Sequence, residues 1–227
     1  MNYLQCFIWG FGGQLYDAQA GKLVLDQREA VQALQFLQAR FSEDKSFVNA
    51  YPVRFLGADD WGMTVWWHEI TAFLGQAAFS FDQVPFPKGP ATSMTNSVSP
   101  TLLAMSHNTS QPDAAWTFIQ WYTRNIPQTA EHNTAFSHVP ARVSQFQQWI
   151  NVRLNEGVKG ARFVAQSAAQ MRVLPALSTD VMNAVQKALA PMYSGNVSAL
   201  SAATIAVETG NAILAEEAAK KSGQLNK

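Results

Sequence analysis

The chain has 227 residues, of which 48% are hydrophobic and 14% charged, and this is enough for one large domain or two small ones with a core. Sixteen basic residues balance sixteen acidic ones, and no run of Lys and Arg occurs, so the sequence argues against nucleic acid as a partner. Low charge, together with many Gln, Asn, Ser and Thr residues, favours a neutral ligand over a charged one.

Sequence features that would mark export, membrane insertion or a bound metal are missing. The start of the chain, Met1 to Cys6, has no basic segment followed by an apolar one, so no export signal is predicted. No stretch reaches the length of about 18 apolar residues that a membrane-spanning helix needs.

Cys6 is the only cysteine, and the four histidines lack metal-ligand spacing. Without a phosphate loop or a dinucleotide fingerprint, we expect no cofactor.

The first 20 residues are rich in aromatic residues and glycine, and Gly12 and Gly13 predict a turn. A capping box follows, with Asp26 as N-cap and Glu29 at the third helical position. Apolar residues then recur at helical spacing, which predicts an amphipathic helix over residues 27–40.

Three of the seven tryptophans, Trp61, Trp66 and Trp67, lie close together between Asp59 and Glu69. The segment 62–70 is predicted to be a strand. Flat rings stack on the C–H faces of sugars while neighbouring polar groups bind the hydroxyls, so the pattern is typical of a saccharide site. The alternative is that Trp66 and Trp67 alternate across the strand, with one of them in the core.

The carboxylates beside these tryptophans, Asp59, Asp60 and Glu69, allow a second hypothesis. A glycoside hydrolase needs two carboxyl groups at a defined separation, and these three residues could supply an acid and a base. The alternative is that they accept hydrogen bonds from ligand hydroxyls or lie in a solvated loop.

Further along, residues 79–86 are predicted to form a strand, and Pro85 to Pro90 to form a stiff extended crossing between structural units. Residues 97–106 are a third candidate strand, with 102–105 as its buried run. A second capping box, Ser110 to Asp113, predicts a helix that is apolar on most of its circumference and therefore well buried. The remaining predicted elements are helices over residues 143–155, 157–171, 178–193 and 197–220.

Five motifs occur in a fixed order along essentially the whole chain. They are Gly12-Gly13 with Asp17 and Asp26, Glu29 to Leu37, Val84 to Pro90, Asp113 to Trp121, and Val139 to Arg142. Their order and spacing resemble the C-terminal half of a family 1 extracellular solute-binding protein, the type that delivers sugars to bacterial ABC importers. The sequence departs from the family pattern over residues 55–63 and 95–100.

The resemblance implies an α/β fold with two lobes, periplasmic binding protein type II-like, truncated at its N-terminus and helix-rich in its C-terminal half. Residues 1–84 and 140–227 would form the C-terminal lobe, and 85–139 the hinge crossing and part of the N-terminal lobe. The implied function is binding of a sugar or oligosaccharide between the lobes, without chemistry, by a monomer in the periplasm or at the cell surface. Its implied partner is the membrane permease of the ABC transporter.

From the rings, the polar groups and the resemblance together, we expect eight ligand-binding residues. They are Trp9, Gly13, Trp61, Trp66, Trp67, His68, Glu69 and Arg142. If the first lobe is absent, the apolar side chains of Leu102, Leu103, Phe118 and Trp121 are expected to lack their packing partners.

Overall fold

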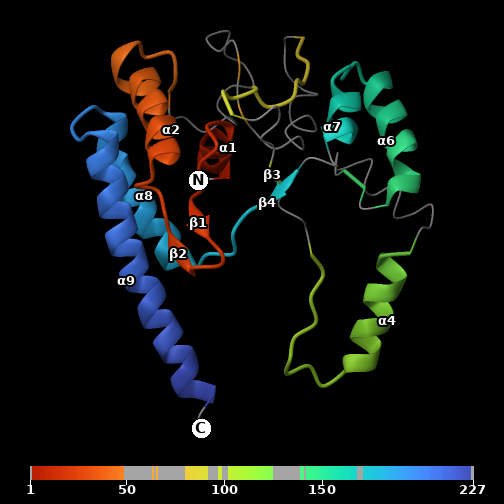
Figure 1. Ribbon diagram of the computed structural model, residues 1–227. Coiled ribbons are helices and arrows are strands. Elements are labelled where there is room, and N and C mark those ends of the chain that lie inside the picture. The colour runs from red at the N-terminus through yellow and green to blue at the C-terminus, as the bar shows by residue number, and fades with distance from the viewer. Residues whose placement is uncertain are drawn as a thin grey trace. The chain divides into compact units, whose positions relative to one another are not determined.

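The computed structural model describes residues 2–48, 63, 65, 80–91, 97–98, 102–124, 139–140, 142–167 and 171–225 (Figure 1). The chain forms two compact units. The terminal unit comprises Met1–Ala50, Phe86–Val98 and Gln170–Lys227, and the middle unit comprises Tyr51–Pro85 and Ser99–Ala169. One boundary between the units therefore falls inside the predicted proline-rich crossing.

The terminal unit joins both ends of the chain. Its elements are α1 (Asn2–Gly10), β1 (Tyr16–Asp17), β2 (Lys22–Leu23), α2 (Arg28–Gln38), the π-helix η1 (Ala39–Glu43), β3 (Ser97–Val98), β4 (Arg172–Val173), α8 (Thr179–Tyr193) and α9 (Ala199–Leu225). Strands β1 and β2 form a short antiparallel hairpin, in which Tyr16 lies opposite Leu23. Strands β3 and β4 are parallel, with Ser97 opposite Arg172.

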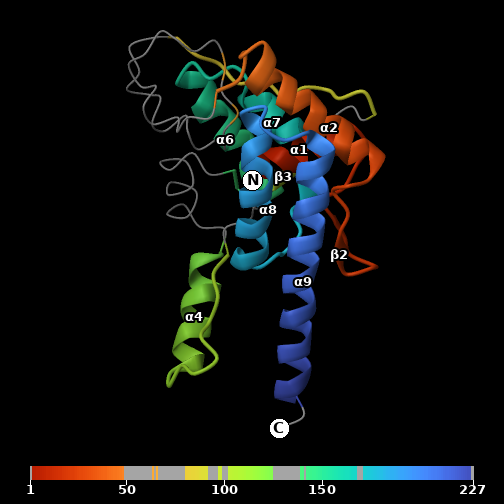
Figure 2. The same ribbon diagram turned by 90° about the vertical axis from the view of Figure 1, so that its left-hand side faces the viewer.

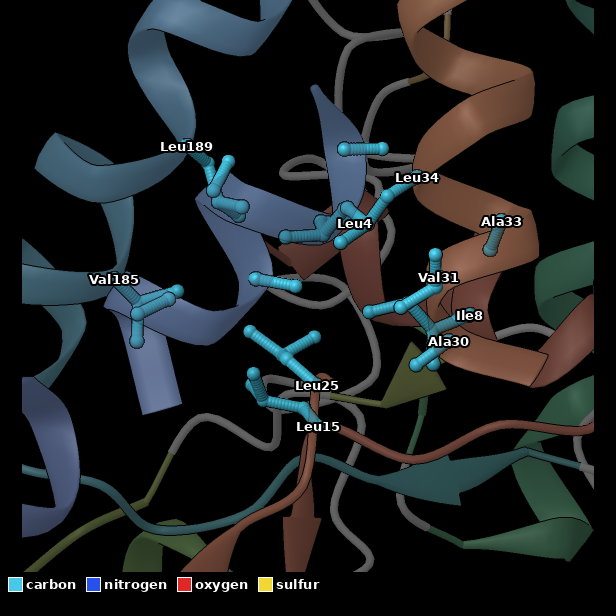
Figure 3. Close-up of a cluster of buried hydrophobic side chains, with 14 of the residues drawn as sticks. Leu4, Ile8, Leu15, Leu25, Ala30, Val31, Ala33, Leu34, Val185 and Leu189 are labelled. Carbon is cyan, nitrogen blue, oxygen red and sulfur yellow. The ribbon is translucent and has the colours of Figure 1, made fainter. Parts of the chain in front are cut away.

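Helices α1, α2, α8 and α9 share one hydrophobic core. Helix α8 buries Val181, Val185, Leu189 and Met192, whose spacing of three or four residues places them on one face. Figure 3 shows Val185 and Leu189 of α8 on one side of this core and α2 side chains on the other. Burial of this apolar stripe is the main favourable term in forming the unit.

Small residues let α9 approach its neighbours closely. Ala199, Ala202, Ala203 and Ala206 of α9 are all buried. Helix α9 runs beside α8 in both views (Figures 1 and 2). At Gly210 a Cβ atom would overlap the side chain of Leu23 in β2, so glycine is needed where the helix crosses the hairpin.

Two carboxamide side chains fasten α9 to the N-terminal segment. Gln38 donates from Nε2 to the carbonyl of Val197 (2.8 Å) and accepts at Oε1 from the N–H of Ala199 (3.2 Å). Asn211 accepts at Oδ1 from the N–H of Leu23 (2.7 Å) and donates from Nδ2 to the Leu23 carbonyl (3.3 Å). Each amide thus satisfies one backbone donor and one backbone acceptor.

The described elements of the middle unit are α4 (Pro112–Tyr122), α6 (Val143–Asn155) and α7 (Ala161–Ser167). A small core surrounds Trp149, which is 2% exposed. The carboxylate of Asp82 accepts the N–H of Gly160 at 2.6 Å, immediately before α7. A Cβ atom at Gly160 would overlap the Gln83 carbonyl, so residues 82–83 lie directly on the turn between α6 and α7.

Several predicted helices are confirmed, with differences at their ends. The helix predicted over 27–40 is α2 followed by η1, and those over 143–155 and 178–193 match α6 and α8. The one predicted over 157–171 is shorter as α7, and the one over 197–220 is longer as α9. Both capping-box assignments are wrong, because Gln27 and Gln111 occupy the N-cap positions and neither makes a side-chain cap. Helix α1 was not predicted.

The predicted strands are less accurate. The strand over 62–70 lies outside the described residues except for Met63 and Val65, and residues 80–86 have no regular structure. Of the strand predicted over 97–106, residues 97–98 form β3, residues 102–106 are not strand, and the residues between lie outside the described ranges. Its expected buried run is wrong, since Leu102 is 77% exposed and Leu103 45%. An apolar run indicates burial only where a second surface covers it.

Helix α4 is also not well buried, contrary to its apolar composition. Trp116, Phe118 and Trp121 are each about half exposed, at 54%, 53% and 48%. Phe118 and Trp121 share this exposure with Leu102 and Leu103. The division into lobes stays a prediction.

We expect Asn211→Ala to lower the free energy of unfolding by about 1–3 kcal/mol, because it leaves the buried N–H of Leu23 without an acceptor. Urea denaturation measures this. The control is Asn151→Ala on α6, whose side chain bonds only to exposed Gln147 and whose loss should change stability by less than about 0.5 kcal/mol. Equal effects of the two substitutions would contradict the bridging role of Asn211.

Burial raises the pKa of Tyr193 from 10.0 to about 12, and its ring packs edge-on against Phe41 at 4.9 Å. Because the folded state holds this proton more tightly, the associated stability is complete below pH 10 and is lost as the pH rises toward 12. Phenylalanine has no proton to lose, so Tyr193→Phe should lack this contribution. Between pH 10 and 12 we expect the unfolding free energy of the variant to fall less steeply with pH than that of the wild type, by up to about 1.4 kcal/mol per pH unit. Denaturation at pH 9, 10 and 11 would test it, and parallel curves would refute it.

Candidate functional site

Of the eight predicted ligand-binding residues, the structure describes Trp9, Gly13 and Arg142. Trp61, Trp66, Trp67, His68 and Glu69 lie outside the described residues, as do Asp59 and Asp60. The geometry of the candidate site is therefore built from the surroundings of the first three.

Trp9 occupies the last turn of α1 and is 6% exposed. The guanidinium carbon of Arg172, in β4, lies 5.5 Å from the centroid of its ring. At this distance the cation is attracted to the electron-rich face of the indole. Trp9 is thus a firmly held ring with a cation over it, and its role as a stacking platform stays a prediction.

Gly13 lies just after the end of α1, in a turn where Gly12 adopts φ +87°. The N–H of Gly13 donates to the carbonyl of Ile8, and that of Gly12 to the carbonyl of Trp9, each at 2.9 Å. A Cβ atom on Gly13 would approach the backbone nitrogen of Ala30 to 2.6 Å. The predicted turn is confirmed, and glycine is required there because α1 ends directly against the first turn of α2.

Arg142 is exposed and occupies the N-cap position of α6. Its Nε and Nη2 both donate to the carbonyl of Thr123, at 3.2 and 2.6 Å. Thr123 is the C-cap of α4, so the guanidinium links the end of α4 to the start of α6. Two of its donors are already used in this contact, and a role in ligand binding stays a prediction.

Two further polar residues beside Trp9 were not predicted as site residues. Gln5 lies one turn earlier on α1, is 3% exposed, and its Oε1 has no hydrogen-bond partner. Arg172 reaches the Trp9 ring because β4 pairs with β3. The spacing of Gln5 and Trp9 could have indicated a shared helix face. Nothing local in the sequence places Arg172 beside α1.

A series of aromatic rings lies elsewhere in the terminal unit. Phe36, which is 38% exposed, lies 6.1 Å from Phe7 and 6.3 Å from Phe47 by ring centroids. Arg40 in η1 lies 5.5 Å from the Phe36 centroid and forms an ion pair with Asp44 at 2.6 Å. Hydrogen bonds from Ser46, assisted by Arg40, hold the pKa of Asp44 below its usual value. The carboxylate of Asp44 therefore neutralises the positive charge of Arg40, the second arginine that lies over an aromatic ring.

Within the ranges that the structure describes, no group of three or more His, Cys, Asp or Glu residues could hold a metal ion. Across those same ranges, no helix combines the length and apolar character needed to cross a membrane. The candidate site consequently consists of aromatic, amide and guanidinium groups, which bind polar ligands through stacking and hydrogen bonds.

Substituting Gly13 by Ala should lower the free energy of unfolding by about 1–3 kcal/mol, because the added Cβ collides with the backbone of Ala30. Gly223→Ala in α9 is the matched control, since nothing lies within 4 Å of a Cβ there. That change should be neutral or stabilise the protein by up to about 1 kcal/mol through helix propensity. Thermal or urea unfolding of both variants measures the contrast, and a neutral Gly13→Ala would contradict the close packing.

Comparison with known proteins gives a likeness in structure rather than in sequence. No protein-family model and no curated protein matches the chain. The structure is similar to that of MalE3 from T. maritima with maltose bound, with a TM-score of 0.64 and 17% sequence identity. The similarity covers 93% of this chain and 57% of MalE3, so the chain spans a little over half the length of that protein. The two therefore share a fold over the matched part, which supports the fold expected from the five motifs.

Proposed function

We propose that the chain belongs to the sugar-binding component of a bacterial ABC importer, of the family 1 extracellular solute-binding type. In this proposal it binds a sugar or oligosaccharide between two lobes, performs no chemistry on it, and delivers it to a membrane permease. It works as a monomer in the periplasm or at the cell surface. The observation that carries the proposal is the likeness, over 93% of the chain, to a protein solved with maltose bound.

The positions of the sequence motifs support this proposal. The first motif is the turn at Gly12 and Gly13, which packs on α2, and the second motif is α2 itself. In the proline-rich motif, Ala91 donates its N–H to the carbonyl of Gly10 at 3.0 Å, and Gly89 leaves no room for a Cβ atom against Gly10. The glycines Gly13 and Gly89 of these motifs therefore lie at close backbone contacts, where a residue with a side chain would not fit.

The exposed side chains of α4 and of residues 102–105 fit the proposal that this chain is part of a larger two-lobe protein. Leu102, Leu103, Phe118 and Trp121 are between 45% and 77% exposed. Each buried side chain of this size contributes about 1.5–3 kcal/mol, so a covering surface would add substantially to stability. In the proposal, the covering surface belongs to the first lobe.

Binding and catalysis can be separated by one set of variants. We expect the larger two-lobe protein to bind maltose or a longer oligosaccharide without hydrolysing it, and Trp66→Ala and Trp67→Ala to weaken binding by about tenfold or more, since a lost stacking ring costs about 1.4 kcal/mol. Isothermal titration against a panel of oligosaccharides measures this, with Trp116→Ala on the half-exposed α4 as control.

Two results would contradict the proposal. Affinity that is unchanged in both Trp66→Ala and Trp67→Ala would show that the tryptophan segment lies away from the ligand. Release of free sugar, abolished by Asp59→Asn, Asp60→Asn or Glu69→Gln, would establish the hydrolase alternative instead.

A further inference from the structure

We propose that Arg172, held over the indole of Trp9, is a saccharide-binding residue whose guanidinium donates hydrogen bonds to hydroxyl oxygens of the ligand. This inference rests on the proposed function and specifies part of its site. The ligand class is a neutral, hydroxyl-rich sugar ring. Both residues belong to the terminal unit, so the pair is complete within that unit.

The first argument is the way in which the guanidinium is held. Trp9 is 6% exposed and thus fixed in the packed end of α1, while Arg172 is exposed on β4. The contact of 5.5 Å between the guanidinium carbon and the ring centroid restrains the cation through the ring face. A guanidinium so placed keeps its five N–H donors for other partners, and little side-chain entropy remains to be lost when it binds.

The second argument compares Arg172 with three other arginines, Arg40, Arg142 and Arg153. Arg40 lies over Phe36 at the same distance of 5.5 Å, but Asp44 takes up its charge at 2.6 Å. Arg142 donates twice to the carbonyl of Thr123. Arg153 is 4% exposed and pairs with Glu156. In contrast, no residue of the described ranges accepts a hydrogen bond from Arg172 or forms an ion pair with it. Its donors are available for a ligand.

The test is an NMR titration of the larger two-lobe protein, labelled with ¹⁵N-arginine, with maltose and separately with glucuronate. The Arg172 Nε–H resonance is assigned by its absence from the spectrum of Arg172→Lys. We expect this resonance to shift and saturate with maltose. Arg172→Ala and Arg172→Lys should each bind maltose about tenfold more weakly, since Lys keeps the charge but loses the planar set of donors.

Arg40→Ala is the matched control, because it removes the other arginine–ring contact of the same length and should leave the affinity for maltose within about twofold of wild type. An unshifted Arg172 resonance, or wild-type affinity in Arg172→Ala, while the wild type binds maltose, would overturn this inference alone. Tighter binding of glucuronate than of maltose would overturn the assignment to a neutral sugar. Failure of the wild type to bind any sugar would instead refute the proposed function on which the inference rests.

Discussion

Two side-chain amides hold the terminal unit together across very long stretches of sequence. Gln38 bonds to Val197 and Ala199, and Asn211 bonds to both backbone polar groups of Leu23. Helices α1, α2, α8 and α9 all contribute buried apolar side chains to the core, but apolar packing alone does not fix the register of one helix on another. The amides supply that register, because each matches a specific donor and a specific acceptor.

This register determines where the candidate site lies. The hairpin of β1 and β2, the end of α1 and the first turn of α2 are positioned by the same packing that receives α8 and α9. The chain segment that leads into α8 passes through β4, and its pairing with β3 sets Arg172 over Trp9. A contact between residue 9 and residue 172 is therefore a result of the helical packing rather than of any local motif.

A comparison of the predicted helices with the observed ones shows which structural features the sequence could and could not indicate. Helices α2, α6 and α8 could be predicted because their apolar residues recur at a spacing of three or four. The N-caps of α2 and α4 could not, since Gln27 and Gln111 occupy these positions where Asp26 and Ser110 were expected. Apolar content alone misled the prediction for Leu102, Leu103 and α4, because burial depends on a second surface that composition does not reveal. Helix α1 was missed because its dense aromatic residues lack an amphipathic period. In the candidate site, residue type singled out Trp9 and Gly13, whose roles in ligand binding stay predictions, whereas the position of Arg172 depends on strand pairing between distant segments.

The separation of Gln38 from its partner Val197, which is 159 residues, also affects how the protein is made. At a synthesis rate of about 5–20 residues per second, α2 waits on the order of ten seconds before α9 leaves the ribosome. During that interval the apolar faces of α1 and α2 lack their partner on α9, and the closing of so long a loop carries an entropic cost. The terminal unit is therefore completed only after both segments have been synthesised.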